Sequence, residues 1–117
     1  MSGPLQVPEV SDLEEMGINV KRGEEPWEVY VKVQAEDGSR VDLSWSEVAA
    51  DASVSWMVGE RELFRSYRQQ VEMISVNRHL GRLYFTIKTV SERVRHGGAT
   101  LIVEVGEHVS VRDSVID

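Results

Sequence analysis

Residues 27–46 read WEVYVKVQAEDGSRVDLSWS, and apolar and polar side chains alternate on both sides of Asp37-Gly38. Alternation of this kind is typical of half-buried β-strands. A three-residue loop, 36–38, brings apolar residues of the two arms opposite one another and sets Lys32 across from Asp42 on the other face. The apolar pairs are Val33 with Val41, Val31 with Leu43, and Val29 with Trp45. We therefore predict a β-hairpin with Gly38 in the left-handed conformation.

Further strands are predicted along the rest of the chain. Val54, Trp56 and Val58 alternate with polar or smaller residues, and 101–105 is predicted to pair with 109–111 across a loop at 106–108. Ile74 and Val76 are predicted to face Leu83 and Phe85 across a four-residue loop at 78–81. Seven or eight short strands predict a mainly β fold, a single antiparallel sandwich or small barrel with one or two short helical turns.

Residues 60–70 leave an alternative open. Leu63, Phe64, Tyr67 and Val71 are spaced as one face of a helix, whereas Gly59-Glu60 equally suits a hairpin that leads into a strand. Strands predicted on both sides favour a strand here. The alternative is an α+β fold with a helix at about 60–70.

The first 26 residues differ in character from the rest. They contain all three prolines, and their apolar residues keep no regular period, which predicts an irregular N-terminal extension, 1–26, before a single β-rich domain, 27–117. Within the extension, Ser11 and Glu14 have capping-box spacing, and Gly17 can end one helical turn. A second short turn is predicted after Ser44, where Glu47 has the same spacing.

Composition limits the class of protein. The chain has 117 residues, 19 of them valine, no cysteine and a formal net charge of −7. That length suits one domain that folds without disulfides, and valine favours strands. No stretch approaches the roughly 20 apolar residues of a membrane span, and no signal peptide is recognised, so we expect a cytoplasmic protein without a membrane segment. The 10 arginines against 3 lysines favour a bacterial source.

The sequence offers little catalytic chemistry. It lacks cysteine, a Gly-x-Ser-x-Gly elbow and the glycine loops that bind nucleotides. The three histidines, His79, His96 and His108, are not spaced as metal ligands, although His108 has Glu107 and Glu104 nearby. We therefore predict no catalytic, cofactor-binding or metal-binding residues, and an enzyme is the weaker expectation.

Charge is distributed unevenly. Residues 1–60 hold 13 acidic and 4 basic residues, whereas 61–117 hold 7 acidic and 9 basic ones. Acidic surfaces attract basic partners and raise association rates. We therefore predict a non-catalytic protein-interaction domain, an adaptor or an inhibitor of a protein partner, that uses an acidic surface formed by Glu24, Glu25, Glu28, Glu36 and Asp37.

Different hypotheses fit the same residues. The Arg-rich segment 61–95 offers an anion or nucleic-acid site at Arg65, Arg68, Arg78 and Arg82 if these cluster on one face, but the acidic net charge makes nucleic acid the weaker expectation. A closed barrel would instead enclose a small molecule, with Tyr67, Tyr84 or His79 converging on it. The basic half also has the charge to neutralise the acidic half within the fold.

Two further expectations concern packing. Trp27, Trp45 and Trp56 occupy apolar positions of their predicted strands and are expected in the core. The valine-rich strands at 100–115 make a homodimer possible, since an unpaired edge strand can pair with a second copy.

Overall fold

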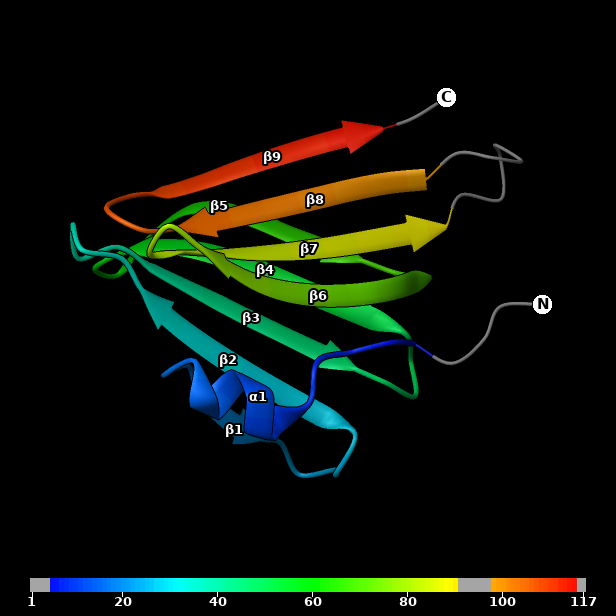
Figure 1. Cartoon of the computed structure of the whole chain (residues 1–117). Helices are drawn as coiled ribbons and strands as arrows, with labels where there is room; N and C mark the ends of the chain where they lie inside the picture. Colours follow the sequence, from blue (N-terminus) through cyan, green and yellow to red (C-terminus); the bar gives the residue numbers. More distant parts are fainter. Residues whose placement is uncertain (1–4, 91–97, 116–117) are drawn as a thin grey trace.

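The structure is a computed structural model that describes residues 5–90 and 98–115. It confirms a mainly β fold made of two antiparallel sheets that pack as a small sandwich (Figure 1). The elements are α1 (Val10–Glu15), β1 (Asn19–Arg22), β2 (Glu28–Gln34), β3 (Arg40–Ser46), β4 (Asp51–Val58), β5 (Arg61–Arg68), β6 (Val71–His79), β7 (Arg82–Val90), β8 (Gly98–Val105) and β9 (Val109–Val115). Strands β1 to β5 form one sheet in sequence order, and β6 to β9 form the other.

The β2–β3 hairpin has the predicted register. Val33 pairs with Val41, Val31 with Leu43, Val29 with Trp45, and Lys32 with Asp42. Ala35 donates its backbone N–H to the carbonyl of Ser39, which closes the three-residue loop, and Gly38 has φ +91°. The apolar residues of both strands are buried and the polar ones face outward. Because a one-residue slip would reverse both faces, the apolar pattern alone fixes this pairing.

Residues 61–68 form strand β5, so the alternative helix at 60–70 is wrong. The strand pairs antiparallel with β4, with Trp56 opposite Phe64, and the register shifts beside Met57 so that Leu63 is an extra residue in a β-bulge. The bulge breaks strict alternation, which explains why the apolar residues have helix-like spacing in the sequence.

The β6–β7 hairpin differs from the prediction. Ile74 pairs with Ile87, Val76 with Phe85, and His79 with Arg82, so the loop contains two residues, Leu80 and Gly81, and not four. Both have positive φ, +52° and +77°. This is the conformation of a tight I′ turn, which favours Asn-Gly. The sequence does not predict this turn, because leucine rarely occupies the first central position of a type I′ turn.

Leu80 is therefore a candidate for stabilisation. Its side chain is 86% exposed, and its left-handed backbone is strained for a branched apolar residue. Leu80→Asn should raise the free energy of unfolding by about 1 kcal/mol, and Leu80→Ala, which keeps the strain, should gain less. Urea unfolding measures both. If the two substitutions raised the free energy of unfolding equally, the exposure of the leucine side chain, and not its backbone strain, would account for the gain.

The β8–β9 hairpin is as predicted, with Val105 opposite Val109 and Val103 opposite Val111 across residues 106–108. Strand β8 also pairs with β7, which places Phe85 beside Val103 and Ile87 beside Leu101. These four side chains are almost completely buried and form the centre of the second sheet's inner face. His96, and Arg93 and Arg95 of the Arg-rich segment 61–95, lie outside the described residues.

Residues 5–22 are more regular than predicted. The helical turn expected near Ser11 is α1, which ends before Gly17 at φ +79°, although its N-cap is Glu9 and carries no side-chain cap. Residues 19–22 form β1, paired with β2, and Gln6 bridges to Met73 on β6. The irregular structure expected in the rest of 1–26 is thus wrong for β1 and for the bridge at Gln6. The second expected turn, after Ser44, is a non-helical turn between β3 and β4.

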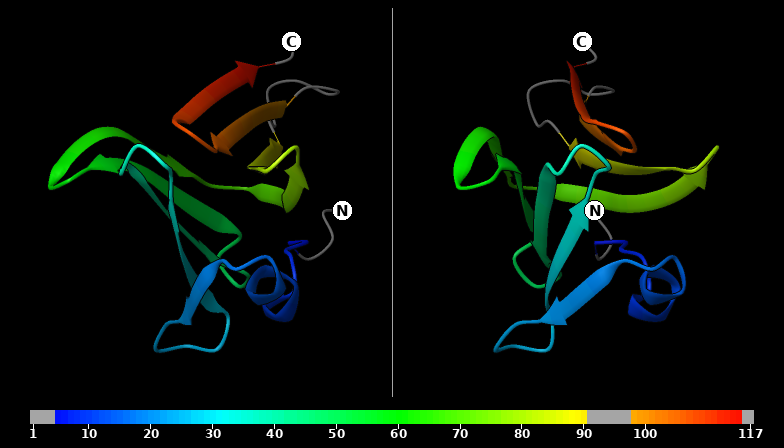
Figure 2. Two further views of the ribbon diagram at one scale, coloured as in Figure 1. Left: turned by 60° about the vertical axis from the view of Figure 1, so that its left-hand side comes forward. Right: turned by 90° about the vertical axis from the view of Figure 1, so that its left-hand side faces the viewer.

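The core lies between the two sheets. Figure 2 shows them as separate layers, with α1 beside β1 at one margin and the β4–β5 hairpin at the other, so the sheets do not close into one barrel. Trp45 is in the core as expected, at 3% exposure. Trp56 is half-buried against the core, and Trp27 lies half-buried in the turn before β2, so the expectation for Trp27 is wrong.

Candidate protein-interaction surface

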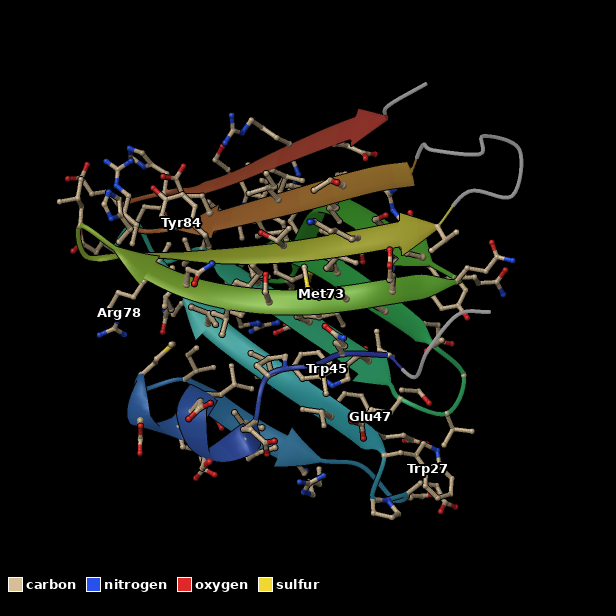
Figure 3. The ribbon with its side chains drawn as sticks, turned by 45° about the vertical axis from the view of Figure 1, so that its right-hand side comes forward. Trp27, Trp45, Glu47, Met73, Arg78 and Tyr84 are labelled. Atoms are coloured by element: carbon tan, nitrogen blue, oxygen red, sulfur yellow. The ribbon has the colours of Figure 1, made fainter. Side chains whose placement is uncertain are left out.

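Two turns meet at one end of the five-stranded sheet. The connection between β1 and β2 spans residues 23–27, and the turn between β3 and β4 spans 47–50. The backbone N–H of Glu47 donates to the carbonyl of Trp27 over 3.1 Å, which joins them. Figure 3 shows Trp27 and Glu47 at this end, and Arg78 and Tyr84 at the other. We call the carboxylates gathered here, with those of the adjoining N-terminal segment, the acidic end: Glu9, Glu24, Glu25, Glu28 and Glu47.

The β1–β2 connection is held by local contacts. Gly23 donates to the carbonyl of Glu28 over 3.0 Å, and Arg22 Nη1 donates to the carbonyl of Pro26 over 2.7 Å. A Cβ on Gly23 would lie 2.6 Å from Glu28 Oε2 and 2.8 Å from the Tyr30 ring, so only glycine allows these side chains to pack over the backbone. The turn therefore presents Glu24 and Glu25 to solvent from a fixed backbone.

The carboxylates of the acidic end lack cationic partners. Within residues 5–90 and 98–113, none of the five forms an ion pair, whereas several arginines pair with acids of their own half of the chain: Arg65 with Glu62, Arg68 with Asp113, and Arg82 with Glu104. Among the described residues, His108 and Asp37 form the one ion pair between the halves, so the arginines of the basic half do not neutralise the acidic half. The acidic end keeps a net negative charge, although Lys21, Arg22 and Lys32 line one surface depression with Glu24 and Glu28.

A surface pocket of about 320 Å³ opens beside the acidic end. Residues 5–10 form one wall, Trp45 and Val29 contribute from the sheet, and Glu9, Glu47 and Arg22 supply the charged groups. Nearby, Val48 is 71% exposed in the β3–β4 turn. An exposed apolar side chain beside charged groups is a common feature of protein-interaction surfaces.

Glu36 and Asp37 do not belong to this surface. They lie in the β2–β3 loop, separated from Glu28 by the full length of β2, about 23 Å for its seven residues. Their backbone N–H groups donate to Gly106 and Glu107 of the β8–β9 turn, each over 2.9 Å. The five predicted acidic residues therefore divide between the two ends, three at one and two at the other.

Asp37 has a structural role in its loop. Its carboxylate accepts hydrogen bonds from the hydroxyl and the backbone N–H of Ser39, and His108 Nδ1 lies 3.5 Å from Oδ2. The Ser39 hydroxyl, then the Ser39 amide, and less strongly His108 lower the pKa of Asp37 below its ordinary value. These bonds hold the loop together and leave the carboxylate engaged within the chain.

This pKa gives a pH-dependent stability of known sign. Because the folded pKa lies below the unfolded one, the contribution is complete above the ordinary pKa of aspartate, about 3.9, and is lost as pH falls through the folded value. In the variants Asp37→Asn and Ser39→Ala, the free energy of unfolding should fall less steeply than in wild type as the pH decreases into the acid range. Urea unfolding from pH 6 to pH 2 measures it, and curves parallel to wild type down to pH 2 would contradict the assignment.

The four arginines predicted for an anion site do not form a cluster. Arg65 and Arg68 lie on β5 but on opposite faces of the sheet. Arg65 pairs with Ser55 of β4, whereas Arg68 pairs with the buried Ala52. Arg78 and Arg82 lie on the other sheet, where Arg78 donates to the carbonyl of Met16. Three of the four meet a carboxylate of this chain, so the arrangement required for an anion site is not formed.

A polar cluster covers the outer face of the second sheet. Glu104 Oε1 accepts hydrogen bonds from Arg82 Nη1 over 3.0 Å and from the Tyr84 hydroxyl over 2.9 Å. Arg82, and then Tyr84, lower the pKa of Glu104, which in turn raises the pKa of Tyr84. The side chain of Arg82 lies over Gly106, where a Cβ would meet Arg82 Cγ at 2.9 Å. The charged and polar groups of this cluster therefore bind one another.

A small-molecule site inside a barrel finds little support in the arrangement of side chains. Tyr67 and Tyr84 lie on the outer faces of different sheets, and His79 is exposed at the end of β6, so the three do not converge on a ligand. Among the described residues, His, Asp and Glu form no group of three that could hold a metal ion. No described helix has the length and apolar character to span a membrane.

Sequence reasoning missed part of the acidic end. Glu9 and Glu47 carry no signal in the sequence because they are distant from Glu24 in the chain and are joined to it only by folding. Val48 gave no signal either, since a single apolar residue in a turn is unremarkable in a sequence. The charge asymmetry does indicate the half of the chain that supplies these carboxylates.

Comparison with known proteins gives one informative result. No protein-family model matches the sequence, and no curated protein matches it. Among solved structures, the fold is similar to a chain of a contact-dependent growth inhibition toxin–immunity protein complex from Klebsiella pneumoniae 342, with a TM-score of 0.76. The match covers 95% of this chain and 96% of that chain at 12% sequence identity. At this identity the likeness shows a shared fold.

Proposed function

We propose that this chain is an immunity-type inhibitor that binds a protein toxin and blocks its activity. The observation that carries the proposal is the likeness of fold over nearly the whole of both chains to a member of a toxin–immunity complex. A match that includes 95% of this chain relates the complete arrangement of two sheets and helix, not one hairpin. A protein partner is therefore the class of ligand to test first.

Charge favours the inhibitor over the toxin as the role of this chain. The net charge is −7, and five carboxylates that form no ion pair with a described residue lie at the acidic end. A toxin that acts on nucleic acid needs cationic surface to bind phosphates, whereas an inhibitor of such a toxin gains from the opposite charge. We infer that the acidic end faces a basic surface of the toxin and steers their association, and that binding takes place in the cytoplasm.

Growth measurements with a defined partner test the proposal. The protein encoded by the adjacent open reading frame is produced from an inducible promoter in a laboratory bacterium, with and without this chain. We expect arrest of growth without the chain, rescue with it, and a one-to-one complex of the purified proteins. Leu13→Ala serves as a control for folding. It removes a buried side chain, so it should weaken rescue in proportion to the decrease in the amount of folded protein. Growth arrest that this chain does not relieve, with no complex formed, would contradict the proposal.

A further inference from the structure

Strand β5 is an open edge of the five-stranded sheet. In the described part of the chain its ladder partner is β4, and its second edge has none. It is eight residues long and carries apolar side chains, with Leu63 45% exposed and Phe64 only half-buried. Figure 2 shows the β4–β5 hairpin reaching past the second sheet. A long open edge that exposes apolar side chains can pair with another strand when the charges on the two strands are complementary.

The remaining described edges are less available. Gln6 covers β6, since Ile74 donates to the Gln6 carbonyl over 2.8 Å and Gln6 donates to Glu72 over 3.2 Å. Strand β1 contains only four residues. Strand β9 is long enough, but its two-fold pairings that match faces are unfavourable. One register pairs Val111 with Val111 of the second copy and sets Val109 opposite Asp113. Others place Arg112 or Asp113 opposite the same residue of the second copy, so that like charges face one another. Strand β5 is therefore the edge to consider.

The bulge in β5 determines how two copies can pair. Arg65 and Tyr67 lie on the outer face, opposite Ser55 and Ser53, and Ser66 lies on the inner face, opposite the buried Val54. Beyond the extra residue the alternation reverses, so Glu62 is also on the outer face. The ion pair between Glu62 and Arg65, 3.5 Å within one chain, agrees with their sharing a face.

Two antiparallel β5 strands match faces outside the bulge in few registers, and one of these, centred on Ser66, pairs only residues 64–68. The longest such register pairs residues 61–66. Its two-fold axis passes between Leu63 and Phe64. It sets Glu62 opposite Arg65 of the second copy, twice, and Leu63 opposite Phe64, twice. Arg61 meets Ser66 and Glu60 meets Tyr67, so no like charges face one another.

We propose that β5 pairs with β5 of a second copy of this chain, which joins two five-stranded sheets into one continuous sheet. The charges and apolar residues of this edge are self-complementary about the two-fold axis, as an isologous dimer requires. The contact buries Leu63 and Phe64 and replaces the Glu62–Arg65 pair within each chain by two pairs between chains. It leaves the acidic end free and does not depend on the proposed function.

Sedimentation equilibrium of the full chain tests the proposal. We expect a mass that rises with concentration toward twice that of one chain. Glu62→Arg and Arg65→Glu, made singly, each put like charges in two pairs and should weaken the dimer at least about tenfold. The two substitutions together in one chain restore opposite charges and should return the dissociation constant to within about twofold of wild type.

Controls separate this interface from others. Leu63→Lys should abolish dimerisation, whereas Val48→Lys, which also places a lysine at an exposed apolar position, should not change it. Circular dichroism verifies that each variant is folded. A chain that stays monomeric up to about 1 mM, or a dimer that Leu63→Lys does not weaken, would overturn the proposal. Failure of the double substitution to restore the dimer would equally exclude this register.

Discussion

Leu13→Ala should lower the free energy of unfolding by about 2–4 kcal/mol, a large part of the stability of a domain of this size. Leu13 is the inward residue of α1 and has no solvent exposure. It packs in the same core as Ile18 and Val31, which join the helix to the five-stranded sheet. Truncation to alanine removes that contact and leaves a cavity that a short helix cannot collapse to fill.

The neighbouring residue supplies the control. Glu14→Ala changes an exposed position of the same helix, so it should alter the free energy of unfolding by less than about 0.5 kcal/mol. Urea unfolding monitored by circular dichroism measures the free energy of unfolding of both variants. This pair also tests the division of the chain at residue 26. If Leu13→Ala were as mild as Glu14→Ala, residues 1–26 would be an extension of an independent domain, as the sequence predicts.

Reversal of charge at the acidic end should slow association with the proposed protein partner about tenfold to hundredfold at low ionic strength. The variant is Glu24→Lys with Glu25→Lys and Glu47→Lys, all at exposed positions of the two joined turns. Each carboxylate lacks an ion pair with another described residue, so folding should lose little. Stopped-flow mixing with the adjacent-gene protein measures the rate.

A second triple variant separates local charge from net charge. Glu36→Lys with Glu60→Lys and Glu107→Lys makes the same change in net charge at exposed turn positions of the opposite end. We expect it to slow association much less, and both effects to shrink toward 1 M salt, where the Debye length is about 3 Å. Equal slowing by the two variants would show that the acidic end is not the surface that meets the partner.

How far the sequence predicts this protein depends on the range of the interactions involved. The β2–β3 and β8–β9 hairpins are predicted to the residue because each has a clear apolar alternation and a loop that contains glycine. The β6–β7 register is wrong by two residues, because Leu80 hides a tight turn that is normally marked by asparagine. A bulge at Leu63 similarly disguised β5 as a possible helix.

The candidate site divides in the same way. The excess of acid in residues 1–60 is visible in the sequence, and Glu24, Glu25 and Glu28 are at the acidic end. Glu36 and Asp37 are not, because one strand's length carries the chain to the other end of the sheet. Glu9 and Glu47 join the site only through the packing of the N-terminal segment and the contact of two turns.

By itself, the sequence determined most of the strands from β2 onward, their inward faces and the sign of the charge in each half, because side-chain alternation and composition are local properties. Only the tertiary structure decided that the strands separate into two sheets, that α1 and β1 complete the core, and which carboxylates share one end. The physical reason is that these arrangements depend on contacts between residues far apart in the chain, whose free energy is gained only when buried apolar surfaces meet.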